Sequence, residues 1–138
     1  MSATKTFFAI STQPEPLPVI AVANAVLDSA WAIGSPTNAP RLQRLVMLCE
    51  NFSQSILGQV LVEEELCYAG DMPYYMELHT AFRSWNADPI RKWGNHPDLR
   101  VPYIVPIDDS RMRIIAEVVN SFEPLPTWQI PRKTPANE

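Results

Sequence analysis

The chain has 138 residues, of which 46% are apolar, and a formal net charge of −4. A chain of this length suits one domain that buries about two-thirds of its unfolded surface. The acidic balance argues against nucleic acid as the main partner, because phosphate binding needs clustered Lys and Arg. No apolar run is long enough to span a membrane, and residues 1–10 lack the longer apolar region of a signal peptide. We therefore expect a cytoplasmic protein that does not enter a membrane.

Proline is the unusual residue, with 14 copies that mostly fall outside the helical patterns. Because Pro ends helices and favours extended backbone, we predict an N-terminal arm at 1–18 and an extended C-terminal tail at 124–138. A single helical domain occupies 19–123 between them. The arm either packs on its own domain or binds a partner. The two cysteines, Cys49 and Cys67, are too few for a disulfide framework or a metal site, and we predict no cofactor.

Two neighbouring helices are expected first. Apolar residues spaced by three and four predict one helix from about Pro18 to Ile33 and a second, central helix from Pro40 to Gly58. Gly34 ends the first helix, and the short connection is rich in turn formers, so the two helices are neighbours. The apolar stripe of the second helix consists of Leu42, Leu45, Val46, Cys49, Phe52 and Ile56.

A small β element and a third helix follow. Residues 59–69 contain two β-capable runs around Glu63–Glu65, which predict a hairpin or one strand after a bend. The third helix is expected from Pro73 to about Asn86. We predict that residues 87–107 form an irregular connector in which Val101–Ile107 is a candidate edge strand.

The last helix is expected from Asp108 to Phe122, with an aspartate at its N-cap. In the tail that follows, Trp128 and Ile130 are predicted to anchor on a surface. The elements together predict a mainly α fold with minor β structure. It would be a compact bundle of about four to five helices with a small β-hairpin or edge strand and Pro-rich extended arms.

No catalytic or metal-binding motif accompanies these elements. The chain has no nucleophile elbow, no glycine-rich phosphate loop and no paired carboxylates, and neither His79 nor His96 has a partner at a metal-binding or catalytic spacing. We predict no catalytic residues and no metal ligands. The densest basic and aromatic cluster is either an interaction surface or local packing beneath surface charges, and it consists of Arg83, Arg91, Lys92 and Trp93.

Several short segments occur in an order found in a known family. Val22–Asp28 carries an Ala-Asn pair on an apolar helix, and Leu42–Leu45 reads Leu-Gln-Arg-Leu. Pro73 and Phe82 follow at matching spacing, and Asp88–Ile90 reads Asp-Pro-Ile. In this order, which runs through about half of the chain, the sequence resembles the Panacea, or SocA-like, antitoxin domain, often described as a phage-associated protein.

The resemblance implies a small helical domain that acts by binding a protein and not by catalysis. Members of that family neutralise toxins by direct contact, and some act as adaptors that deliver the toxin to a protease. A prophage or mobile-element origin is implied as well. The predicted protein-binding residues are Gln43, Arg44, Tyr74, Tyr75, Arg83 and Trp93.

Two alternatives stay open. The first is a structural or assembly protein whose Pro-rich arms bind neighbouring subunits, including further copies of the chain. The second is a small enzyme that uses His79 or His96 with nearby acids.

Overall fold

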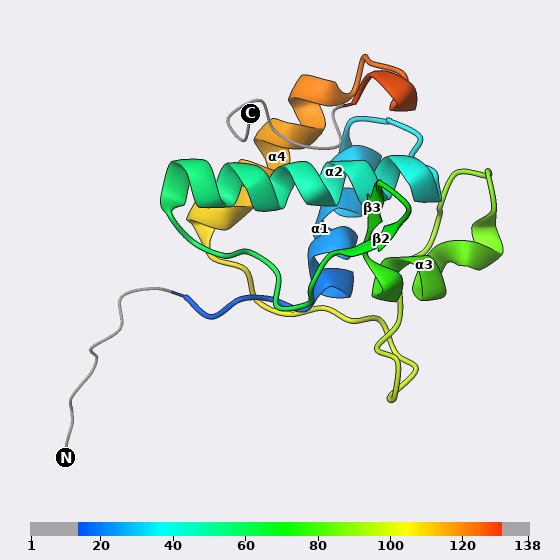
Figure 1. Cartoon of the computed structure of the whole chain (residues 1–138), viewed down its shortest axis with the longest axis horizontal. Helices are drawn as coiled ribbons and strands as arrows, with labels where there is room; N and C mark the ends of the chain where they lie inside the picture. The colour runs from blue at the N-terminus through cyan, green and yellow to red at the C-terminus, as the bar shows by residue number, and fades with distance from the viewer. Residues whose placement is uncertain (1–13, 131–138) are drawn as a thin grey trace.

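The computed structural model describes residues 14–130 (Figure 1). This part of the chain forms a mainly α fold with one small hairpin, as predicted. No helix in it is long and apolar enough to cross a membrane. The predictions for residues 1–13 and 131–138 lie outside the described residues. The elements are α1 (Val19–Ala32), α2 (Ala39–Phe52), β2 (Cys67–Ala69), β3 (Met72–Tyr74), α3 (Met76–Phe82) and α4 (Asp109–Phe122).

The α1 helix is the most buried element. It packs against α2, α3 and α4, and all of its residues from Val19 to Leu27 are buried. A helix that is apolar on every side is typical of the centre of a fold. The Val19 N–H donates to the Glu64 carboxylate at 2.7 Å, which supplies an acceptor that Pro18 at the N-cap does not.

The α2 helix lies across α1, as Figure 1 shows. It begins where predicted, because the Asn38 side chain accepts the Arg41 N–H at 3.0 Å and Pro40 occupies the first turn. It runs on into a π-helical turn at Ser53–Leu57 that ends at Gly58 with φ 67°. The wider turn breaks the 3.6-residue spacing. Ile56, predicted on the buried stripe, is therefore 66% exposed.

The hairpin lies later in the chain than predicted. Val62 pairs with Leu17 in a parallel bridge, and the hairpin is formed by β2 and β3 around Gly70. Pro73 therefore lies in a strand and does not start α3, which begins at Met76. The helix is also shorter than expected, since a 3₁₀ turn at Arg83–Trp85 follows it. The periodic pattern did not reveal that extended backbone continues as far as Tyr75.

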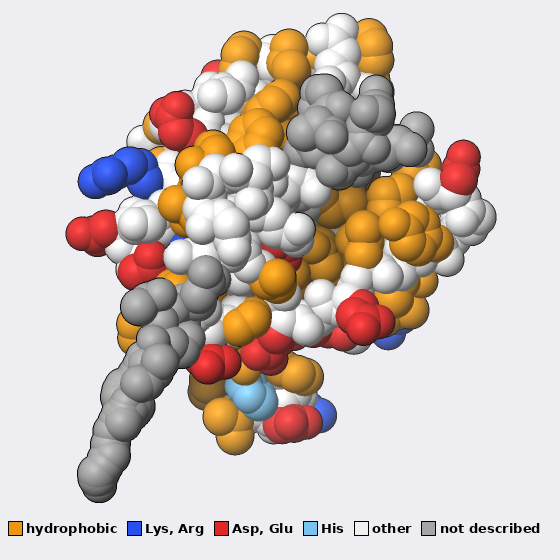
Figure 2. All heavy atoms as spheres, turned by 60° about the vertical axis from the view of Figure 1, so that its left-hand side comes forward, with side chains coloured by type: hydrophobic (Ala, Val, Ile, Leu, Met, Phe, Trp, Pro, Cys, Tyr) orange, Lys and Arg blue, Asp and Glu red, His pale blue; other side chains and the backbone are white. Residues whose placement is uncertain are grey.

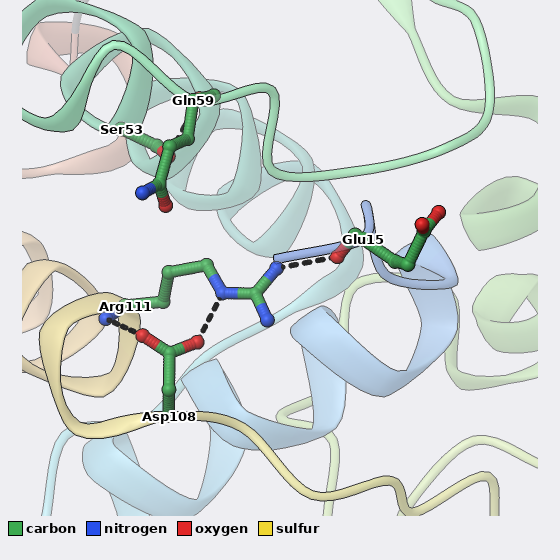
Figure 3. A network of polar contacts seen from close by, with 5 residues as sticks. All are labelled: Glu15, Ser53, Gln59, Asp108 and Arg111. Atoms are coloured by element: carbon green, nitrogen blue, oxygen red, sulfur yellow. Dashed lines mark hydrogen bonds and ion pairs between the residues drawn. The ribbon is translucent and has the colours of Figure 1, made fainter. Parts of the chain in front are cut away.

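The N-terminal arm, as far as it is described, packs on its own domain. Leu17 is buried, and Arg111 of α4 donates to the backbone carbonyl of Glu15 at 2.8 Å. Arg111 also pairs with Asp108, which caps α4 (Figure 3). In the same view, the side-chain amide of Gln59 points toward Arg111.

The C-terminal segment is anchored by only one of the two residues that were predicted to anchor it. Ile130 is buried at 1% exposure, whereas Trp128 is 74% exposed on a 3₁₀ turn. The candidate edge strand at 101–107 is also absent. A single bridge between Asn95 and Pro102 replaces it, since Pro102 and Pro106 carry no N–H for a ladder.

Candidate functional site

A hollow of the described chain lies between α3 with its 3₁₀ turn and the loop at 92–100. It has a volume of about 570 Å³, and we name it the Trp93 groove. Figure 1 shows the loop hanging below α3. The walls combine aromatic, basic and polar side chains, and include Glu77, Trp85, Lys92, Trp93, His96 and Arg100.

A buried amide on α1 positions the loop. The Asn24 side chain accepts the Gly94 N–H at 2.7 Å and donates to the Gly94 carbonyl at 3.0 Å. It also donates to the Tyr103 carbonyl at 3.1 Å. Because Asn24 is fully buried within an apolar helix, these bonds fix the loop against the core. Gly94 is required there, since a Cβ at this position would lie 2.7 Å from the Phe82 ring.

Two tryptophans are held in place beside the loop. The Trp93 indole N–H donates to Asp28 at 2.8 Å, and the Trp31 indole N–H donates to the Ile90 carbonyl at 3.1 Å. Their ring centroids are 6.4 Å apart, with an angle of 37° between the ring planes. A second hollow of about 430 Å³, which we name the Trp31 hollow, is lined by Trp31, Arg91, Lys92, Trp93, Asn95 and Pro102.

Several cations of the fold make internal hydrogen bonds, and the basic side chains that line the groove are not among them. Arg41, Arg44 and Arg111 donate to backbone carbonyls. Among the described residues, the side chains of Lys92 and Arg100 show no hydrogen bond or ion pair, and both residues line the groove. Figure 2, which brings the left-hand side of Figure 1 forward, shows a face with scattered acidic side chains and few Lys or Arg.

The two histidines occupy different places. His96 lines the groove, and its Nδ1 accepts the N–H groups of Asp98 and Leu99, both at 3.1 Å. The proton of the neutral ring is then on Nε2, so His96 can donate to a ligand but does not offer a free base. His79 does not line the groove, and its ring lies edge-on to Tyr74. No group of metal-ligating side chains occurs among residues 14–130.

The predicted binding residues that keep accessible surface fall in three places. Trp93 is 43% exposed and lies between the two hollows. Arg83 is exposed at the 3₁₀ turn but does not line the groove. The remaining candidates with accessible surface meet at a third hollow of about 190 Å³, which is lined by Gln43, Arg44 and Tyr74.

Several of these residues also hold the fold together. Gln43 accepts the Tyr75 N–H at 2.8 Å and donates to the Tyr75 carbonyl at 2.9 Å. Arg44 donates to the Thr127 carbonyl. Tyr75 is 3% exposed, and burial raises the pKa of its hydroxyl. Its ring therefore serves the core and is not an accessible binding group, because the chain stays extended up to α3 and turns this side chain inward.

Sequence reasoning found Trp93 and the basic run beside it but missed Trp31, Trp85 and Arg100 as their neighbours. The one available signal for the loop contact was Asn24, a polar residue in an otherwise apolar helix. Its partners are 70 and 79 residues away, so no local pattern identifies them. Comparison of the chain with protein-family models, curated proteins and solved structures gives no match.

Proposed function

We propose that the chain is a protein-binding domain that takes an acidic segment of a partner protein in the Trp93 groove. The observation that carries this proposal is that the side chains of Lys92 and Arg100, which have no polar partner among the described residues, line a groove that also exposes Trp93. Arg and Trp side chains are enriched among residues that dominate binding energy. Complementary charge would also guide the partner to this side of the molecule.

The fixed geometry of the site supports binding. Asn24 and Asp28 hold the loop and the Trp93 ring before any partner arrives, so little side-chain or loop entropy is lost on association. A catalytic use has less support. His96 already accepts two backbone N–H groups, and His79 lies outside the groove.

A more specific form of this function is neutralisation of a toxin, either directly or as an adaptor to a protease. Its support is the resemblance of Val19–Ile90 to Panacea antitoxins. Co-expression with the product of the adjacent gene tests it. Rescue of growth together with co-purification is expected, and absence of both would contradict the antitoxin function while leaving the binding groove to be tested separately.

The binding function itself is tested by selecting short random peptides on the purified chain. We expect enrichment of Asp and Glu, and loss of the selected peptides with a Lys92→Glu, Arg100→Glu double variant. The matched control is Arg113→Glu, which reverses an exposed cation on α4 outside the groove and should keep binding. Selection of basic peptides, or equal loss in the control, would contradict the proposal.

A further inference from the structure

The Trp93 groove and the Trp31 hollow are two parts of one surface. Lys92, Trp93 and Asn95 line both of them. An extended segment that follows the groove therefore passes over Trp93 and reaches the second hollow. The Trp31 hollow, at about 430 Å³, falls within the range of roughly 300–1,000 Å³ that is usual for ligand sites.

The two indole rings can contact a ligand through their faces and do not need to do so through their N–H groups. Both indole N–H groups are already bonded within the chain, at 2.8 Å and 3.1 Å, so neither needs an acceptor from a ligand. The two rings, whose centroids are 6.4 Å apart and whose planes are inclined by 37°, meet at a corner of the hollow that both of them line. Such a corner favours another aromatic ring, which can lie edge-on or offset against either face.

The charges beside this corner restrict the ligand further. Arg91 and Lys92 line the hollow, and both side chains are exposed. They disfavour a cationic ligand such as a methylated lysine, even though tryptophan faces attract cations. The Asp28 carboxylate accepts the Trp93 N–H and is not among the residues that line the hollow.

We infer that the Trp31 hollow is a subsite for an aromatic side chain that stands next to carboxylates in the bound segment. This inference rests on the proposed binding function and adds the chemistry of the partner. The aromatic ring enters the corner between Trp31 and Trp93, and the flanking carboxylates lie against Arg91 and Lys92. A segment that carries aspartate or glutamate but no aromatic residue would occupy only the Trp93 groove and would leave the Trp31 hollow empty.

The indole N–H signals of the four tryptophans offer a direct readout in a ¹⁵N-labelled sample of the full chain. The probes are the peptide Gly-Glu-Glu-Phe-Glu-Gly, its Leu counterpart in place of Phe, and its counterpart with Lys in place of Glu. We expect the Phe peptide to shift the signals of Trp31 and Trp93. Trp128, which lies on the C-terminal 3₁₀ turn outside both hollows, should not respond.

The Phe peptide should bind about two- to twelvefold tighter than the Leu peptide, as for other aromatic pairs. Trp31→Ala should remove this preference, and Trp31→Phe should retain part of it. Trp85→Ala, on the groove wall away from the hollow, should keep the preference even where overall affinity falls. The spectra of each variant report whether it is folded.

The outcomes separate the two proposals. Equal binding of the Phe and Leu peptides, with the Lys peptide weaker, would overturn the aromatic subsite and leave the acidic-segment function standing. Failure of both acidic peptides to bind, or equal binding of the Lys peptide, would overturn both. Tighter binding of oligothymidylate than of the Phe peptide would also overturn both, because stacked bases and phosphates would then be the preferred ligand.

Discussion

The two ends of the structure are held by different chemistry. On the α3 side, the neutral amides of Asn24 and Gln43 each accept a backbone N–H and donate to the carbonyl of the same residue, Gly94 or Tyr75. At the C-terminal end, Arg41 donates to the carbonyls of Phe122, Glu123 and Leu125. An amide side chain forms hydrogen bonds with both the N–H and the carbonyl of one residue, whereas an arginine side chain donates to the carbonyls of several residues.

This difference determines which basic side chains are used in hydrogen bonds within the fold. The last carbonyls of α4 have no intrahelical partners, and a cation there also interacts favourably with the helix dipole. Arg41 and Arg44 are thereby used within the fold. The loop at 92–100 is held by the neutral amide of Asn24 and, at Trp93, by Asp28, and the side chains of Lys92 and Arg100 have no polar partner among residues 14–130.

The largest expected effect comes from Asn24→Ala. The change leaves the Gly94 N–H and the Tyr103 carbonyl without their partner, while the Gly94 carbonyl keeps the N–H of Tyr103. A loss of about 3 kcal/mol in the free energy of unfolding is expected at 1–3 kcal/mol for each group that loses its partner. Urea unfolding measures it. The matched control is Asn120→Ala, which removes an exposed bond to the Ala116 carbonyl and should cost less than about 0.5 kcal/mol. Similar losses in both variants would contradict the role given to Asn24.

Gly94→Ala should have the next largest effect. The added Cβ would lie 2.7 Å from Phe82 Cζ and 3.0 Å from Ile20 Cγ2. Overpacking of this kind costs about 1–3 kcal/mol, and the loop should move away from α3. Urea unfolding gives the loss in stability, and the Trp93 indole signal reports the loop. A Phe82→Leu background should reduce the added cost of the alanine, and an unchanged cost would show that the clash is absent.

Arg41→Lys should cost less, about 1–2 kcal/mol, because an ammonium cannot reproduce the forked donors that reach three carbonyls. Burial lowers the pKa of Arg41. Because lysine also carries a positive charge, the change tests the hydrogen bonds of Arg41 and not its charge. Thermal unfolding measures the effect. The loop at 92–100 should be unaffected, and a shift of the Trp93 indole signal as large as that of Trp128 would show that the two ends are not independent.

The smallest effect concerns Glu64 and depends on pH. Burial raises the pKa of Glu64 in the folded state, although the N–H of Val19 opposes this. The folded chain therefore holds this proton more tightly than the unfolded chain, and Glu64 lowers stability as the pH rises above about 4.3. Glu64→Gln, which keeps an acceptor, should gain less than about 1 kcal/mol at neutral pH and nothing in acid.

Urea unfolding at several pH values checks this prediction. The gain of Glu64→Gln over the original chain should grow between about pH 4 and pH 7. Glu65→Gln is the control, since Glu65 is exposed in the same acidic run. A gain that stays constant with pH would show that the charge of Glu64 is not responsible.

The sequence was informative where periodicity and capping act locally. The apolar spacing, Pro40 and an aspartate cap predicted the starts of α2 and α4, and the structure shows that Asn38 and Asp108 are the capping residues. The sequence pattern failed at Pro73, which is equally compatible with a strand and with a helix start. The candidate site was found only in part, because its assembly depends on contacts between Asn24 and a loop far along the chain.

The Asn24 contact determines when the groove can form during synthesis of the chain. It joins residues that are 70 and 79 positions apart, and it is this contact that fixes the loop of the groove. Contacts of such separation form late, since a long loop must close before they contribute. During synthesis α1 is complete long before Gly94 and Tyr103 are available. The Trp93 groove therefore forms only once the chain has been synthesised past Tyr103, and a chain that stops earlier lacks the contact that fixes the loop.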